Sequence, residues 1–328
     1  MALLVSLFFG FVPMFLFAAF VNWLDRYEKE PKLLLGAAFF WGVAIAAGGA
    51  FIINTAFGIG IFYATGSEGI ADFATTSLVA PFVEEFLKGL AVAIVFFLFH
   101  KEFDSILDGV IYAAIVALGF AATENTFYIY SKGYQEGGWG ALWFLVFIRV
   151  ILVGWQHPFY TSFTGIGFAV SRMNRNPIIK FIAPLIGYGV AVSMHAFHNT
   201  FGGLIGGIAG LAVGTLVDWF FWGCMFIFII WMIINEGNLL KRQLREEVNA
   251  GLISQTQYKT ATSPFGASGA NFNALLNGKF RKVSRFYQVC GELAHKKEQL
   301  AKVGDEHGNT AIIQSLRQEL ATLGPQVA

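Results

Sequence analysis

Charged residues are scarce in this chain. They make up 13% of its 328 residues, whereas hydrophobic residues make up 56%. A soluble protein carries about 25% charged residues, so the composition excludes an ordinary soluble domain and indicates a polytopic membrane protein. The formal net charge is only +1, which supplies none of the basic excess that nucleic-acid binding requires. We therefore expect the lipid bilayer as a partner, and no nucleic acid.

Cysteine is also rare, because only Cys224 and Cys290 occur. One lies in an apolar run and the other in a polar segment, so no disulfide framework follows from them. The first apolar run, Ala2 to Leu24, lacks a basic segment before it and a small-residue cleavage site after it. We expect this run to be retained as a helix and not removed as a signal peptide.

Long apolar runs are abundant. A membrane-spanning helix needs roughly 20 apolar residues, and glycines between Gly202 and Gly214 leave room for a short extra helix. The expected fold is an all-α bundle of about seven transmembrane helices, or eight, followed by a cytoplasmic helical tail. The seven predicted spans are residues 2–24, 33–63, 73–99, 108–131, 140–171, 178–201 and 208–235.

Lys and Arg are distributed unevenly among the predicted loops. They occur after the first, third, fifth and last spans, whereas the loops after the second and sixth spans have none. Positively charged loops stay on the cytoplasmic side. We therefore expect a multi-pass integral membrane protein, with the N-terminus outside and the C-terminus in the cytoplasm.

The composition turns polar from Glu236 onward. This change divides the chain into a membrane domain, residues 1–235, and a tail, residues 236–328. Within the tail, residues 254–278 are rich in small and polar residues, which is typical of a flexible linker. The flanking parts have helical patterns but no catalytic motif. We expect the tail to be a solvated appendage or a dimerising helix; a regulatory or substrate-docking role is the alternative.

The third predicted span contains three charged residues within five positions: Glu84, Glu85 and Lys88. A charge at the bilayer centre costs from about 3 to more than 10 kcal/mol, so these side chains must face a polar interior. Other spans contribute polar residues at helical spacings. These are Asp108, Glu124, Asn125, Arg149, His157, His195, His198, Asn199 and Asp218.

Three glutamates (84, 85 and 124) supply acid, Lys88 and Arg149 supply base, and the three histidines can take either state. This cluster is close to neutral, as a site of low dielectric constant requires. Lys88 lies four positions from Glu84 and three from Glu85, so either glutamate could be its ion-pair partner. The other glutamate would be a general base for water. Three side chains could donate hydrogen bonds to an oxyanion: His157, His195 and Asn199.

Structural roles are the alternatives for several of these residues. A single intramembrane Glu–Lys pair often ties two helices together, and a membrane histidine is commonly a hydrogen-bonding residue. Asn199 stands next to glycines and could cap a helix. Asp218 has no charged companion on its own span, and we expect it to be structural.

In this order, the clusters resemble the PrsW family of intramembrane proteases, which is similar to the glutamic-type CAAX prenyl protease and bacteriocin-processing group. The resemblance covers about residues 1–235, including the acidic, proline-ended loop from Asp25 to Pro31. The matching pieces are E-E-x-x-K (Glu84–Lys88), G-F-A-x-x-E-N (Gly119–Asn125), Arg149 with His157 eight residues later, and H-x-x-x-N (His195–Asn199).

The resemblance implies a role for each matching residue. Glu84 would be the water-activating carboxylate, with Glu85 as its partner. Lys88 and Arg149 would orient the carboxylates or keep them ionised. His157 and His195 would be acid/base or oxyanion histidines, and Asn199 an oxyanion donor.

Two sequence features depart from the family pattern, and the requirement for a metal ion stays open. His157 is followed by Pro158, and His198 adds an imidazole beside the His-to-Asn pair. The family has been described with metal-dependent and metal-independent mechanisms, so zinc stays open as a cofactor. Its candidate ligands are Glu124, His157 and His195, although the chain has no H-E-x-x-H motif.

Three functions are compatible with these residues. The resemblance implies an intramembrane endopeptidase that cleaves single-span membrane proteins, such as anti-sigma factors. A second function is ion, proton or lipid transport through the same buried charges. A third is zinc-dependent hydrolysis of lipid amides. The substrate and the oligomeric state do not follow from the sequence.

Overall fold

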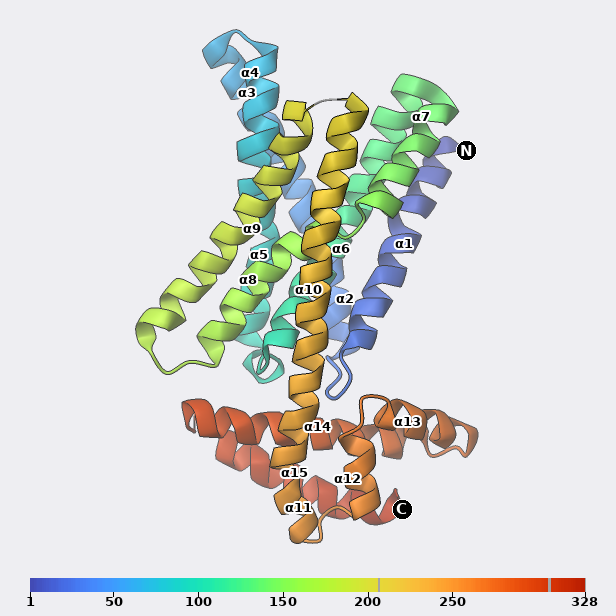
Figure 1. The fold of residues 1–328 in the computed structure, drawn as a ribbon, viewed down its shortest axis with the longest axis vertical. Helices are drawn as coiled ribbons and strands as arrows, with labels where there is room; N and C mark the ends of the chain where they lie inside the picture. The colour runs from blue at the N-terminus through green and yellow to red at the C-terminus, as the bar shows by residue number, and fades with distance from the viewer. Residues whose placement is uncertain (206, 306–307, 328) are drawn as a thin grey trace.

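A computed structural model describes residues 1–205, 207–305 and 308–327 (Figure 1). Helices hold most of the described residues, and no strand occurs among them, which confirms the all-α fold class. The elements of the membrane domain are α1 (Ala2–Leu24), α2 (Lys32–Phe40), η1 (Trp41–Ala46), α3 (Ala47–Thr65), α4 (Glu68–Ala74), η2 (Thr75–Val79), α5 (Ala80–Leu98), η3 (His100–Glu102), α6 (Ile106–Phe127), η4 (Tyr128–Gln135), α7 (Glu136–Val146), η5 (Phe147–Leu152), α8 (Gln156–Arg172), α9 (Pro177–Ile205) and α10 (Gly207–Gln243).

Among the described residues, five helical segments are long and apolar enough to cross a membrane, judged by length and composition. The protein is therefore an integral membrane protein, while the number of seven or eight spans stays a prediction. The α5 helix is not among the five, and it carries Glu84, Glu85 and Lys88. The five segments are Ala2–Leu24, Lys32–Thr65, Ile106–Arg172, Pro177–Phe201 and Ala209–Asn249.

Local sequence signals set several helix ends. Gly66 ends α3 in the left-handed conformation, with φ of 66°, which glycine adopts without steric cost. Ser105 and Asp108 form a capping box that begins α6. Asp108 is therefore a helix cap, and not a member of the intramembrane charge cluster.

The α6 helix forms the centre of the membrane domain, and nearly all of its residues are buried. Small residues let its neighbours approach closely. A Cβ atom on Gly165 of α8 would lie 1.9 Å from the carbonyl oxygen of Gly109 in α6, and one on Gly119 would lie 2.0 Å from that of Phe39 in α2. These backbone contacts hold the first turn of α6 against α8 and its later part against α2.

Irregular helical geometry occurs on both sides of the charged cluster. The π-helical segment η2 leads directly into α5, which carries the predicted charged residues Glu84, Glu85 and Lys88. The π-helical segment η5 ends at Leu152, and α8 begins only at Gln156. The expectation of one continuous helix over residues 140–171 is therefore wrong, because the helix is interrupted between Arg149 and His157. Such segments are frequent at functional sites.

The tail is a helical layer at one end of the bundle, and α10 runs from the bundle into it (Figure 1). The prediction of a flexible linker over residues 254–278 is wrong, because this range contains two helices. Ser254 and Gln257 cap the first of them, and Ala274 of the second packs into the core of the tail. The tail elements are α11 (Arg245–Asn249), α12 (Gln255–Ala261), α13 (Gly266–Leu276), α14 (Phe280–Val303), α15 (Asn309–Leu323) and η7 (Gly324–Gln326).

The tail is also bound to the loops of the membrane domain. Gln288 of α14 exchanges two hydrogen bonds with the backbone of Lys29, at 2.8 and 3.0 Å. Asp104, just before α6, accepts from His295 at 3.1 Å and from Lys296 at 2.6 Å. These contacts make the tail a docked layer and not a freely solvated appendage.

Candidate active site

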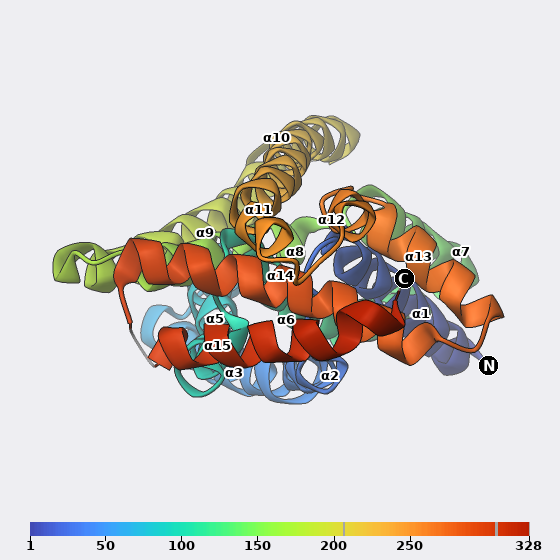
Figure 2. The ribbon, with the colours of Figure 1, turned by 90° about the horizontal axis from the view of Figure 1, so that it is seen from below.

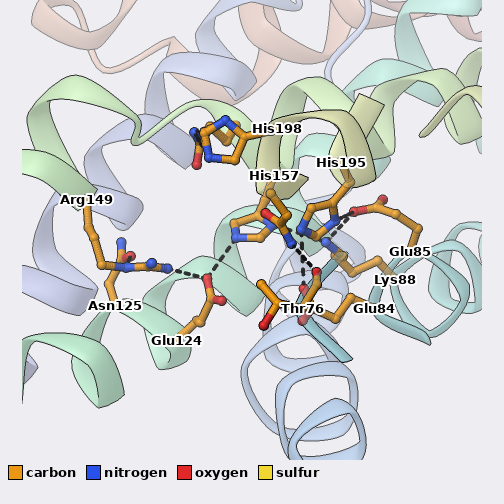
Figure 3. Close-up of polar contacts among 12 residues, drawn as sticks. Thr76, Glu84, Glu85, Lys88, Glu124, Asn125, Arg149, His157, His195 and His198 are labelled. Carbon is orange, nitrogen blue, oxygen red and sulfur yellow. Dashed lines mark hydrogen bonds and ion pairs between the residues drawn. The ribbon is translucent and has the colours of Figure 1, made fainter. Parts of the chain in front are cut away.

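A cavity of about 500 Å³ lies between α3, η2, α5, α6, α8 and α9. Six of the eight predicted site residues line it, and the other two, Glu85 and Lys88, are fully buried behind its wall. Figure 3 shows the side chains converging from separate helices. The six lining residues are Glu84, Glu124, Arg149, His157, His195 and Asn199.

Glu85 is the fixed carboxylate of the site. Its Oε1 atom lies 2.6 Å from Lys88 Nζ and 3.0 Å from His195 Nδ1, and its Oε2 atom accepts from Thr161 at 2.8 Å. Two donors and an ion pair satisfy both oxygens, which is what a buried charge requires. Glu85 therefore acts as an anchor for its neighbours.

Glu84, the adjacent residue, points into the cavity. Its Oε1 atom accepts from Asn54 at 3.3 Å. Its Oε2 atom lies 3.9 Å from His195 Nε2 and has no hydrogen-bond partner. Since adjacent helical side chains diverge by about 100°, one glutamate faces the wall and the other faces the cavity. Glu84 thus offers the oxygen that is free to bind water.

His157 joins the two halves of the cluster. Its Nδ1 atom lies 3.2 Å from Lys88 Nζ, and its Nε2 atom lies 2.8 Å from Glu124. An ammonium group only donates, so Nδ1 accepts and Nε2 carries the proton that goes to Glu124. Arg149 forms an ion pair with the same Glu124 oxygen and donates through Nε to Asn125 at 2.9 Å.

His195 is oriented by two contacts. Its Nδ1 atom donates to Glu85, so the lone pair of Nε2 faces Glu84. Its ring stacks on Tyr160, with centroids 5.0 Å apart and planes inclined by 19°. The ring is therefore held with one nitrogen toward the anchor and the other toward the cavity.

His198 has different partners, although it is on the same helix. Its Nδ1 atom lies 2.9 Å from Asp218 of α10, and Gln156 Nε2 lies 3.0 Å from the same carboxylate. Asp218 has no charged companion within the predicted span 208–235 but pairs with His198 across helices, a contact that the order of residues in the chain does not reveal. The sequence offers both His195 and His198 as candidates for one role. The structure distinguishes them, because His195 binds Glu85 and His198 binds Asp218.

Asn199 donates from Nδ2 to the carbonyl oxygen of Thr76 in η2, at 2.9 Å. One amide hydrogen therefore ties α9 to η2, and one remains for a further acceptor. Asn54, Tyr160, Thr161 and Gln156 were not predicted as site residues. Asn54 could have been found as a lone amide in a long apolar run, whereas a membrane-helix Thr gives no such signal.

Three metal-ligating side chains lie close together at the cavity: Glu84, His157 and His195. Each offers one donor atom, and these atoms are within 4.8 Å of one another. This group differs from the predicted set, which had Glu124 in place of Glu84. The difference arises because Glu124 is bound by Arg149 and by His157 Nε2.

Comparison with known proteins gives a consistent family. Residues 30–232 match the PrsW family intramembrane metalloprotease. The chain is 30% identical over 174 residues to "Protease PrsW" of Geobacillus kaustophilus, covering 51% of this chain and 68% of the relative. It is 32% identical to "Protease PrsW" of Bacillus subtilis over 114 residues and to that of Clostridioides difficile over 122.

The last two matches cover 34% and 37% of this chain, and 48% and 49% of those relatives. No solved structure matches the chain. The family match includes every predicted site residue and ends before the tail. This chain belongs to the PrsW family of intramembrane proteases.

Proposed function

We propose that this protein is an intramembrane endopeptidase that cleaves a single-span membrane protein within or beside its membrane segment. A regulator of the anti-sigma-factor type is the substrate class we favour, by analogy with the family resemblance. One observation carries the proposal: the unpartnered oxygen of Glu84 faces a polar cavity inside an apolar helical bundle, 3.9 Å from His195.

In the proposed reaction, Glu84 accepts a proton from a water molecule in the cavity as the water attacks the scissile carbonyl carbon. The carbonyl oxygen becomes an oxyanion, to which the remaining amide hydrogen of Asn199 would donate from the cavity wall. The C–N bond then breaks, and the proton on Glu84 passes to the departing amine. Glu85 and Lys88 keep His195 and His157 in place throughout.

The family name implies a metal ion, and the donor set fits one. Two histidines and a carboxylate are a common ligand set of catalytic zinc. His195 donates Nδ1–H to Glu85, as metal-ligating histidines typically do to a carboxylate. With zinc bound, Glu84 would be a ligand instead of the base, together with His195, and His157 would bind after exchanging one of its present partners. Zinc would supply a Lewis acid that polarises the carbonyl and acidifies water.

The test compares new protein N-termini in membranes that contain the wild type or Glu84→Gln at equal levels. Glu136→Gln is the matched control, because Glu136 is an exposed glutamate that pairs only with Lys132 in the described contacts. We expect new termini near membrane segments with the wild type and the control, and none with Glu84→Gln. Unchanged termini in the Glu84 variant would exclude the mechanism.

The orientation is also a proposal. We place the docked tail and the loops after α1, α5 and α8 in the cytoplasm, since these loops carry Lys and Arg. The N-terminus would then lie outside a bacterial cytoplasmic membrane. The division into a membrane domain, residues 1–235, and a tail, residues 236–328, follows the same boundary. Cysteine-accessibility labelling at Lys32 and Glu68 distinguishes the two sides.

A further inference from the structure

The helix α13 exposes large apolar side chains on one face. The exposed fractions are 62% for Phe265, 64% for Phe272 and 72% for Leu276. The opposite face is alanine, of which Ala274 is buried in the core of the tail. The helix therefore holds the tail core with one side and presents bulky hydrophobic groups on the other. Several bulky apolar side chains exposed on one helix face indicate an interaction site.

The position of Phe265 shows which way this face is turned. The Arg26 guanidinium lies 3.2 Å over the ring of Trp23 and 4.8 Å from the ring centroid of Phe265. Trp23 is exposed in the last turn of the membrane-spanning α1, where aromatic residues mark the boundary between lipid and water. The start of α13 is thus fixed beside that boundary.

The helical period extends this placement along α13. Phe272 and Leu276 follow Phe265 by seven and eleven residues, which brings all three to within about 20° of one direction at 100° per residue. The stripe therefore faces the same side as Phe265, toward the bilayer. In Figures 1 and 2, α13 lies at the bundle end of the tail, at its edge near α1.

The charge around α13 has one sign. Residues 248–291 contain no Asp or Glu, whereas they contain Lys259, Lys279, Arg281, Lys282 and Arg285. Lys279, Arg281 and Lys282 follow α13 directly and are exposed. Arg285 is bound by Glu292 and Glu319. The three exposed cations complement the anionic phospholipids of a cytoplasmic leaflet.

We propose that α13 is an interfacial helix that lies on the surface of the bilayer that the chain spans. Phe272 and Leu276 insert between lipid head groups, and Lys279, Arg281 and Lys282 bind anionic phospholipid phosphates. Two observations favour lipid as the occupant: the stripe continues from the boundary marked by Trp23, and the flanking charge is complementary. The proposal concerns residues outside the family match and does not depend on the catalytic proposal.

The experiment uses the full chain in nanodiscs, with a nitroxide label at Phe272→Cys in a Cys224→Ser background. Gln314→Cys on the exposed side of α15 is the water-facing control. Collision with lipid-soluble oxygen and with water-soluble nickel chelate reports the surroundings of each label. We expect the oxygen-to-nickel ratio to be several-fold higher at 272 than at 314.

The head-group part is tested with nanodiscs of phosphatidylcholine alone and of phosphatidylcholine with phosphatidylglycerol. We expect the anionic lipid to raise the ratio at 272, and the triple variant Lys279→Gln, Arg281→Gln, Lys282→Gln to abolish that rise. Equal ratios at 272 and 314 would overturn the proposal, as would shielding of 272 from both reagents, which indicates a protein cover. A ratio independent of phosphatidylglycerol would overturn the binding of anionic head groups.

Discussion

Lys88 Nζ lies 2.6 Å from Glu85 Oε1, so the ammonium pairs with the glutamate three residues away and not with Glu84, four residues away. Both partners are fully buried. Glu84 consequently keeps an oxygen without a partner at the cavity. Glu85 thus anchors its neighbours, whereas Glu84 is buried at the cavity wall with one oxygen unpartnered.

This division predicts different stabilities for two glutamine variants. In Glu85→Gln, the buried Lys88 loses its carboxylate, and breaking a buried ion pair costs about 3–5 kcal/mol. Glu84→Gln removes no ion pair of Lys88, so its unfolding midpoint stays close to that of the wild type. Thermal unfolding in detergent measures both. A Glu85 variant as stable as the Glu84 variant would refute the anchoring role.

Zinc binding is expected to require His195 of α9 and not His198, which is on the same helix. We expect His195→Ala to abolish binding of added Zn²⁺, and His198→Ala to leave it unchanged, because His198 is paired with Asp218 away from the donor group. Glu85→Gln, which replaces the carboxylate that accepts from His195 Nδ1 with a neutral amide, would weaken the affinity about 10- to 100-fold. Titration of the purified, metal-free protein provides the measurement, and equal affinities in the two histidine variants would contradict the donor assignment.

Arg149 is expected to act through its shape as well as its charge. Arg149→Lys keeps the charge beside Glu124 but loses the Nε hydrogen bond to Asn125. A hydrogen bond involving a charged group contributes about 1.5–3 kcal/mol, so we expect kcat/KM to fall about 10- to 100-fold. The control is Arg175→Lys, on the loop between α8 and α9. Full activity in Arg149→Lys would show that charge alone suffices.

The close contact between α6 and α8 predicts a strong effect of one methyl group. Gly165→Ala would place Cβ 1.9 Å from the Gly109 carbonyl oxygen, so the two helices must separate. Overpacking of this kind costs typically about 1–3 kcal/mol. Gly189→Ala in α9 meets no atom within 4 Å and is the matched control. Denaturation midpoints of the two variants compare the effects, and equal midpoints would argue against tight packing at Gly165.

Docking of the tail should weaken at alkaline pH. Burial opposes charging of His295, but its hydrogen bond to Asp104 and the charge of that carboxylate raise its pKa from 6.5 to about 9. The stabilisation is therefore complete below pH 6.5 and is lost as the pH rises through about 9. Glu28, Asp108 and Glu236 also face His295 and favour its charged form.

The measurement is the unfolding midpoint of the full chain between pH 6.5 and 9.5. We expect it to fall in the wild type by more than in His295→Gln, where this group no longer titrates. Asp104→Asn should also reduce the dependence, because it removes the main cause of the raised pKa of His295. Identical pH profiles for all three proteins would rule out this linkage.

Much of the helical layout was predictable, because apolar length and helix caps are local properties. The predicted run 2–24 matches α1, 178–201 lies within α9, and the helical pattern predicted after residue 278 matches α14 and α15. The two tail helices inside residues 254–278 were missed. Small residues permit a flexible chain. The capping box of Ser254 and Gln257 favours the first helix, and packing of Ala274 into the tail core favours the second.

Which charged residues make up the site could be inferred from residue types and apolar runs alone. Burying a charge in a membrane is so costly that Glu84, Glu85, Lys88, Glu124 and Arg149 had to meet one another. Only the tertiary structure decided which pairs form: Lys88 with Glu85, Arg149 with Glu124, and His198 with Asp218. The free-energy cost of burying a charged side chain depends on the residue type, which can be read from the sequence. Whether two side chains pair depends on the distance between their helices, which is set by contacts between residues far apart in the chain.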